Sequence, residues 1–318
     1  MTALPPAVAR APLAGAAPSR RGRGGLRGRA PGAVAPYLFL APFLLLFLAF
    51  QVAPMIYALW LSLFRERLVG GTVFVGLDNY ADVLTDPSLW RGVGNMALFG
   101  LIQVPVMLGI ALVLALLLDS ALVRGRAFFR TAFYLPYAVP SVVAALVWGY
   151  LYGPVFGPFA QGAEALGLGA PNFLSAQWMI PSLANIVTWQ FTGYNMVILF
   201  AALQAVPRDL EEAASLDGAG PAAFAWHVKV PLIRPAIILC VIFSIIGTFQ
   251  LFNEPRIMAS IAPNVIGDDY TPTLYAFSLA FTSLRFDLAA ALSFVIGLIV
   301  AVVSYAFLAL AARAEARR

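Results

Sequence analysis

Residues 95–118 read NMALFGLIQVPVMLGIALVLALLL, an apolar run without one charged side chain. A helix needs about 20 predominantly apolar residues to cross the hydrocarbon core of a bilayer. Five further stretches qualify by length and apolarity, at residues 34–64, 131–152, 181–205, 236–252 and 288–312. The sequence therefore predicts an all-α membrane protein with six transmembrane helices.

The composition supports the same prediction. Of the 318 residues, 61% are hydrophobic and 11% are charged. Soluble domains contain about 45–50% apolar and about 25% charged residues. A water-soluble core of this size would not hide so much apolar surface, so the excess is expected to face lipid.

Three residue types occur only once and exclude several kinds of chemistry. The single cysteine, Cys240, forms no intrachain disulfide, and we interpret it as a small apolar core residue. The single histidine, His227, has no second imidazole with which to share a metal, and it is interpreted as a solvated residue or a partner contact. The single lysine, Lys229, follows Val228, whereas a phosphate-binding P-loop needs Gly-Lys-Ser/Thr. We predict no metal, no cofactor and no enzymatic activity.

Three segments divide the chain. Residues 1–33 contain six arginines among Ala, Pro and Gly, a composition that predicts a disordered basic tail. Residues 34–312 form the predicted transmembrane domain, and residues 313–318 form a C-terminal tail. The first apolar run is too long for the apolar region of a signal peptide, so we expect it to remain as an anchor.

The distribution of basic residues predicts the orientation. With the N-terminus inside, 15 of the 20 Lys and Arg residues fall in inner segments and five in outer ones. Basic residues accumulate on the cytoplasmic side of membrane proteins. We therefore expect a multi-pass protein of the cell (inner or plasma) membrane with both termini in the cytoplasm.

The inner loop at residues 206–235 is too long for a tight connection between helices. Within it, residues 209–218 read DLEEAASLDG, which predicts a short amphipathic helix that begins with acids and ends at glycine. Pro221, Pro231 and Pro235 follow. A short helix presented in this way is typical of a docking surface for a soluble partner, although a structural connector has the same pattern.

This loop also contains a spaced motif that resembles the EAA signature of ABC importer permeases. The matching positions are Glu212, Ala213, Ala214, Gly218, Val228, Val230 and Pro231. The family has Ile and Leu where this chain has the two valines. Residues 74–95, 126–157 and 206–220 resemble the maltose-type, carbohydrate-importing branch, and the similarity covers roughly residues 35–312. Residues 259–264 depart from the family's Thr-Gly-Gly-Pro-like turn, which leaves the shape of the outer loop at residues 253–287 open.

The resemblance implies a type I ABC importer permease core with a cytoplasmic coupling helix. It also implies four kinds of partner: a second and usually different permease, two cytoplasmic ATPase subunits, an extracytoplasmic solute-binding protein and a carbohydrate substrate. We predict no nucleic-acid partner. The implied ATPase-coupling residues are Glu212, Ala213, Ala214, Asp217, Gly218 and Pro231, with Glu212 as the acidic contact and Gly218 as the end of the helix.

Polar side chains inside the predicted spans point to a substrate site, because polar groups are costly in lipid. They occur as three pairs four residues apart, which share a helix face: Tyr137 and Ser141, Gln190 and Tyr194, and Gln250 and Glu254. These positions coincide with the sugar site of maltose-type permeases; Tyr137, Ser141 and Tyr194 also match in residue type. The alternative is hydrogen bonding between helices, or for Glu254 an ion pair with Arg256.

The second hypothesis is a stand-alone, ion-coupled secondary transporter. Such a carrier needs acidic groups or broken helices within the membrane. The predicted spans between Thr131 and Phe252 contain no carboxylate. A membrane enzyme is not supported either, because the chain has no HExxH motif and no membrane-embedded carboxylate pair. The identity of the sugar stays open and includes glycerol phosphate diesters.

Overall fold

The structure, a computed structural model, describes residues 35–67, 70–120, 123–167, 169 and 171–316. The predicted tail at residues 1–33 lies outside these residues, as does the end of the predicted C-terminal tail. The chain divides into two compact units, residues 1–53 and residues 54–318. The described part of the first unit contains α1 (Ala35–Phe47), the π-turn η1 (Leu48–Val52) and the first residue of α2 (Ala53–Ser62).

The second unit is almost entirely helical. After α2 its elements are β1 (Phe64–Arg67), β2 (Gly71–Phe74), α3 (Asp78–Thr85), α4 (Pro87–Asp119), α5 (Arg126–Tyr134), η2 (Leu135–Ala138), α6 (Ser141–Leu151), α7 (Pro158–Ala165), α8 (Met179–Leu203), α9 (Asp209–Leu216), α10 (Pro221–Phe224), η3 (Ala225–Lys229), α11 (Val230–Leu232), α12 (Arg234–Phe249), α13 (Asn253–Ile261), α14 (Pro272–Phe277), η4 (Ser278–Thr282) and α15 (Phe286–Ala316).

Four helices of the described chain are long and apolar enough to cross a membrane: Tyr37–Ser62, Pro87–Asp119, Met179–Leu203 and Phe286–Arg313. Two bent pairs raise the number to six if each pair is one span. Arg126–Ala138 and Ser141–Leu151 meet at 92°, and Pro221–Leu232 and Arg234–Phe249 meet at 66°. The span predicted over residues 131–152 is therefore bent rather than one continuous helix, and the helix predicted to end at Phe252 ends at Phe249.

The sharper bend has a local cause. Val139 precedes Pro140, and the proline ring disfavours the helical conformation of the residue before it. Val139 is accordingly extended, with ψ of 125°, between the 3₁₀-helix η2 and the start of α6. Pro136 lies within η2, where it also removes a backbone donor.

The all-α prediction is also incomplete, because β1 and β2 form a short antiparallel hairpin that pairs Phe64 with Phe74 and Arg67 with Gly71. The Phe64 and Phe74 rings pack edge to face at 5.3 Å. The sequence analysis places Phe64 at the end of the apolar run at residues 34–64 and predicts no strand after it. The hairpin adds no core to the helical bundle and does not change the fold class.

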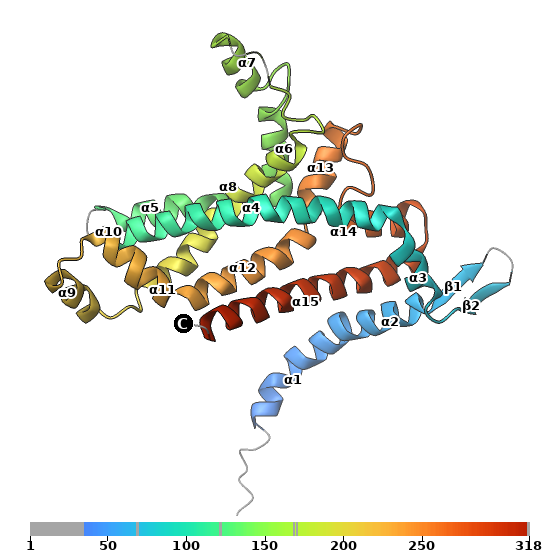
Figure 1. The fold of residues 1–318 in the computed structure, drawn as a ribbon. Helices are drawn as coiled ribbons and strands as arrows, with labels where there is room; N and C mark the ends of the chain where they lie inside the picture. Colours follow the sequence, from blue (N-terminus) through green and yellow to red (C-terminus); the bar gives the residue numbers. More distant parts are fainter. Residues whose placement is uncertain (1–34, 68–69, 121–122, 168, 170, 317–318) are drawn as a thin grey trace, which may run out of the picture. The chain divides into compact units, whose positions relative to one another are not determined.

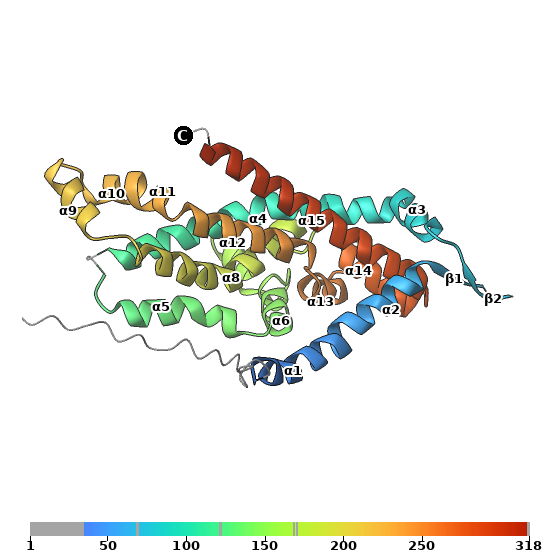
Figure 2. The same cartoon turned by 90° about the horizontal axis from the view of Figure 1, so that it is seen from below.

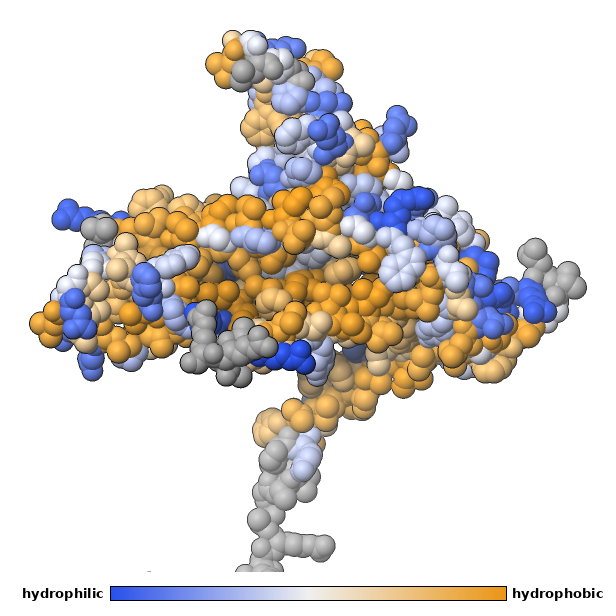
Figure 3. Space-filling model, viewed as in Figure 1, coloured by the Kyte–Doolittle hydropathy of each residue, from blue (hydrophilic) through white to orange (hydrophobic). Residues whose placement is uncertain are grey.

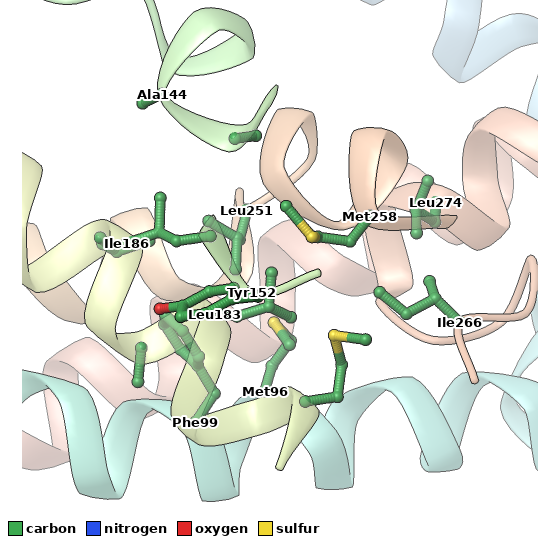
Figure 4. Close-up of a cluster of buried hydrophobic side chains, with 14 of the residues drawn as sticks. Met96, Phe99, Ala144, Tyr152, Leu183, Ile186, Leu251, Met258, Ile266 and Leu274 are labelled. Atoms are coloured by element: carbon green, nitrogen blue, oxygen red, sulfur yellow. The ribbon is translucent and has the colours of Figure 1, made fainter. Parts of the chain in front are cut away.

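Within the second unit, α4, α8, α12 and α15 run lengthwise beside one another in both views of the ribbon (Figures 1 and 2). The central core lies between α4, α6, α8 and α13 and is filled by Met96, Phe99, Leu183, Ile186 and Met258 (Figure 4). Hydrophobic side chains dominate the visible faces of α4, α12 and α15, whereas hydrophilic residues gather near α3 and α9 (Figure 3). This surface is the one expected for helices in contact with lipid.

Polar contacts fix the start of α4. The Asp86 carboxylate caps the helix by accepting a hydrogen bond from the Ser88 amide at 2.8 Å. The Tyr275 hydroxyl donates to the other carboxylate oxygen, and Arg91 forms an ion pair with Asp269. Burial alone would raise the pKa of Asp86, but the hydrogen bonds from Tyr275 and Ser88 outweigh it and hold that pKa below its ordinary value.

A glycine brings the bent pair against α8. A Cβ at Gly193 of α8 would lie 1.9 Å from the Phe133 carbonyl oxygen and 2.9 Å from the Tyr134 Cα. Only a residue without a side chain allows this close approach of two backbones. Gly193 therefore sets the position of α5 and η2, and with it the position of Tyr137.

Replacing Gly193 with alanine is expected to destabilise the chain by at least about 1–3 kcal/mol, because backbone rather than a flexible side chain fills the space. Gly94→Ala is the matched control, since nothing lies within 4 Å of the added Cβ and the residue is exposed on α4. The apparent Tm of the detergent-purified chain measures both effects. Equal Tm values for the two variants would contradict the packing argument.

Candidate functional site

A cavity of about 430 Å³ opens between α4, η2, α8, α12 and the segment that joins α12 to α13. Its wall combines aromatic and aliphatic side chains with many hydrogen-bonding groups. The polar lining residues are Gln103, Tyr137, Ser141, Tyr194, Asn195, Ser244, Thr248, Gln250, Asn253 and Glu254. A concave, mostly apolar site with a few converging polar groups is the usual form of a small-molecule site.

Five of the six predicted substrate residues lie on this wall: Tyr137, Ser141, Tyr194, Gln250 and Glu254. Two of the three spacing arguments nevertheless fail. The bend at Val139 separates Tyr137 from Ser141, and the end of α12 at Phe249 separates Gln250 from Glu254, so neither pair shares one helix face. The breaks in the helices, rather than a common face, bring these side chains to the cavity.

Tyr137 and Tyr194 form one corner of the cavity. Their rings stack with centroids 4.8 Å apart, and the Phe191 ring packs edge-on against Tyr137 at 5.5 Å. Stacked rings of this kind present a flat apolar surface with polar hydroxyl tips. The corner therefore offers both stacking area and hydrogen bonds to a ligand with apolar faces and hydroxyl groups.

Gln190 is the predicted substrate residue that does not line the cavity. It is 4% exposed, and its Nε2 donates a hydrogen bond of 2.8 Å to the Val139 carbonyl oxygen. That carbonyl lies at the bend, where no helical donor reaches it. The structure thus gives Gln190 the alternative role considered from the sequence, a hydrogen bond between segments that stabilises the bend.

Glu254 is a buried carboxylate, 4% exposed, at the first turn of α13. The ion pair with Arg256 considered from the sequence is absent from the contacts of the described residues, and the Arg256 guanidinium instead lies 5.2 Å from the Phe277 ring centroid. No Arg, Lys or His is among the described residues that line the cavity. Glu254 is therefore the one acidic or basic group on this part of the wall.

The sequence analysis missed five polar lining residues, of which Gln103, Ser244 and Thr248 lie in apolar runs without a motif to identify them. Thr248 is the clearest case: it is 5% exposed, and its hydroxyl has no hydrogen-bond partner in the described part of the chain. Gln103 is a buried amide within the charge-free run at residues 92–118, where a polar side chain is costly in lipid and therefore indicates a function. Asn253 donates to the Ser141 hydroxyl at 2.8 Å and joins α13 to α6 across the break.

The inner loop forms the predicted short helix. α9 covers Asp209–Leu216, with three acids in its first turn. It ends in a Schellman motif, in which the Gly218 amide donates to Ser215 and the Ala219 amide donates to Ala214. Gly218 has φ of +79°, a conformation that favours glycine. The predicted coupling residues Glu212, Ala213, Asp217 and Gly218 are exposed, and Ala214 is half-buried.

Pro231 lies in α11, one turn before the bend that leads into α12. His227 is exposed, and its Nδ1 lies 3.0 Å from the Ala223 carbonyl oxygen. Cys240 is buried in an apolar cluster between α4, α8 and α12. A second, polar cavity of about 400 Å³ lies between the loop and the ends of α4 and α8, and Glu211 and Glu212 line it.

Residues 108–318 match the family described as "Binding-protein-dependent transport system inner membrane component". The chain belongs to this family. It is a permease component of an ABC importer, located in the inner membrane and crossing it several times. Family members are transport permeases rather than enzymes, and the EAA motif at residues 212–218 is typical of them.

Individual relatives agree with this assignment. The chain is 34% identical to the lactose transport system permease protein LacF of Rhizobium radiobacter, over 85% of this chain and 91% of the relative. It is 30% identical to the arabinooligosaccharides transport system permease protein AraP of Bacillus subtilis, over 85% and 86%. In fold it is similar to a bacterial ABC transporter for the acidic polysaccharide alginate, with a TM-score of 0.77, 20% identity, and coverage of 88% and 95%.

Gln190 is buried at the bend, whereas Gln250 is exposed on the cavity wall, so their replacement should affect stability and transport differently. Gln190→Ala should lower the stability by about 1–3 kcal/mol, because it leaves the Val139 carbonyl without its buried donor. Gln250→Ala removes an exposed amide from the cavity wall, so it should lower uptake by the assembled importer without lowering the apparent Tm. If both variants lose the same amount of Tm, the distinction between the two glutamines is wrong.

Proposed function

We propose that this chain forms half of the translocation pore of an ATP-driven, binding-protein-dependent carbohydrate importer. The observation that carries the proposal is the cavity lined by Tyr137, Ser141, Tyr194, Gln250 and Glu254 in a chain of this family. The LacF and AraP relatives, named for saccharide transport, support a carbohydrate as the substrate. The proposed partners are a second permease, two cytoplasmic ATPases and an extracytoplasmic solute-binding protein.

In the proposed topology, residues 34–312 form the six-span transmembrane domain. The bent pair Arg126–Leu151 counts as one span, and of the other bent pair only α12 crosses the membrane, as the fifth span. Both termini are cytoplasmic, because this orientation places 15 of the 20 basic residues inside. Residues 1–33 and 313–318 are then cytoplasmic tails, and residues 206–235 are the cytoplasmic coupling loop.

In the proposed mechanism, α9 docks in a cleft of an ATPase subunit, with Glu212 as its acidic contact. Ala213 and Ala214 allow close approach, and Asp217 and Gly218 end the helix at a defined residue. Nucleotide binding draws the two docking helices of the permease pair together, and the cores rock from inward-open to outward-open. The binding protein then releases its ligand into the cavity, and hydrolysis resets the cycle.

The lining of the cavity favours an uncharged substrate. Two like charges about 4 Å apart repel by about 4 kcal/mol at an effective dielectric constant of 20. An anionic ligand would meet Glu254 without a basic side chain on the described wall to offset the repulsion. We therefore propose a neutral saccharide, held by hydroxyl and amide groups and by the ring faces of Tyr137 and Tyr194.

No observation favours the ion-coupled secondary transporter. The chain belongs to a family whose members work in binding-protein-dependent systems. Uptake by the purified chain alone in liposomes, driven by a proton or sodium gradient, would be required to revive that hypothesis.

The experiment that tests the proposed function is the double variant Glu212→Gln with Gly218→Val. A β-branched residue is strained at the φ of +79° found at residue 218, so the helix should lose both its end and its acidic contact. We expect the assembled importer to lose substrate-stimulated ATP hydrolysis while membrane insertion is unchanged. Glu66→Gln with Gly71→Val, which also combines an acid with a glycine of positive φ, is the control. Coupled hydrolysis by the first variant would overturn the assignment of α9.

The charge argument predicts the effect of Glu254→Gln on selectivity. Burial raises the pKa of Glu254, so the comparison is made at a pH high enough to ionise it. The affinity ratio for lactose over its carboxylate analogue lactobionate should then fall at least about tenfold, since the removed repulsion exceeds the 1.4 kcal/mol that a tenfold change requires. Intrinsic fluorescence titration of the purified permease pair measures both affinities. Ser244→Ala, which removes a neutral polar group from the same wall, should leave the ratio unchanged.

A further inference from the structure

The only lysine of the chain is largely buried beside the inner loop. The side chain of Lys229 is 14% exposed, and its Nζ lies 2.6 Å from the Asp119 Oδ2. Asp119 is the last residue of α4, and its side chain is 9% exposed. Lysine and aspartate are rarely buried unless they are paired, because both lose hydration. This ion pair therefore holds residues 110 positions apart in one fixed contact.

The second oxygen of the same carboxylate binds the end of another helix. Gln204, directly after α8, donates from Nε2 to the Asp119 Oδ1 at 2.6 Å. Asp119 places a negative charge at the C-terminus of α4, where the helix dipole is also negative, so a cation is needed to offset it. Lys229 supplies that cation, and the carboxylate joins the ends of α4 and α8 to the loop.

Lys229 also faces the short helix α9. The Glu211 Oε2 lies 3.8 Å from Nζ, and the Phe224 ring centroid lies 5.1 Å from it. The ammonium group is thus placed between an acid of α9 and the acid that ends α4. α9 connects to α8 and α12 through turns and short helices, and Lys229 links Glu211 of α9 to Asp119 at the end of α4.

We propose that Lys229 is a positioning residue that transmits the displacement of α9 to α4, with Asp119 and Gln204 as its partners. The inference rests on the proposed function, in which ATPase closure moves α9. α4 is one helix from Pro87 to Asp119 that also contains Pro105, and Gln103 on the cavity wall lies 16 residues before Asp119, about 24 Å along α4 at 1.5 Å per residue. A movement at Lys229 therefore reaches the cavity through α4 as well as through α12.

Hydrogen–deuterium exchange of the assembled importer, with and without ATP and vanadate, tests this proposal without knowledge of the sugar. In the wild type, nucleotide should change the exchange of α9 (residues 209–216) and of the last turns of α4 (residues 112–119). In Lys229→Met the change should remain in α9 and fall about tenfold in α4, a typical size for a coupling free energy. Lys229→Arg should behave as the wild type. Arg126→Met, which removes a cation from the same cavity without contact to Asp119, should also behave as the wild type.

The exchanged set Glu211→Lys, Lys229→Asp and Asp119→Lys, which reverses the charge on both sides of residue 229, separates transmission from folding. It restores opposite charges in reversed order, so the nucleotide-dependent change in the exchange of α4 should return. The proposal is overturned if the exchanged chain assembles without this change in α4, or if it does not assemble. A full α4 response in Lys229→Met overturns it as well. A wild type in which nucleotide changes α9 but not α4 overturns only this inference, whereas a wild type in which α9 does not respond overturns the proposed function.

Discussion

Backbone polar groups in a bilayer must find partners within the protein, and this requirement governs the bend at Val139 and Pro140. The bend leaves the Val139 carbonyl without a helical donor, and the Gln190 amide supplies one. Gly193, one turn further along α8, allows the backbone at Phe133 to approach closely. Together these two residues hold η2 and α6 at a large angle, and the space beside that angle is the cavity.

The sequence predicts what depends on length and composition. The apolar runs indicate the spanning segments, and the acids and glycine of residues 209–218 correctly predict a short helix with a left-handed end. Five of the ten polar residues on the cavity wall are predicted as well, among them Tyr137 and Tyr194, which are polar groups in apolar surroundings. What the apolar pattern does not reveal is where a span breaks. Pro136 and Pro140 are local signals, but the angle between α5 and α6 depends on Gln190 and Gly193, which lie some 50 residues later in the chain.

The same limit explains the different outcomes for Gln190 and Gln250. Both are amides within predicted spans, and spacing alone assigns both to the substrate. Only the fold distinguishes the one that bonds to a carbonyl from the one that remains free to meet a ligand. Thr248 illustrates the converse case, because a lone threonine in an apolar helix has no pattern to identify it, and its unpartnered hydroxyl becomes visible only in the structure.

The length of α4 has a consequence for the surrounding lipid. Its 33 residues correspond to about 50 Å, well beyond the hydrocarbon thickness of about 30 Å. The excess lies largely at the start of the helix, where Arg91 and Asp86 are held by Asp269 and Tyr275. A helix longer than the hydrocarbon layer adjusts to thinner or thicker bilayers by tilting, and its apolar surface stays covered by lipid as it does so. Membranes of different thickness therefore change the inclination of α4 before they expose any of its apolar side chains to water.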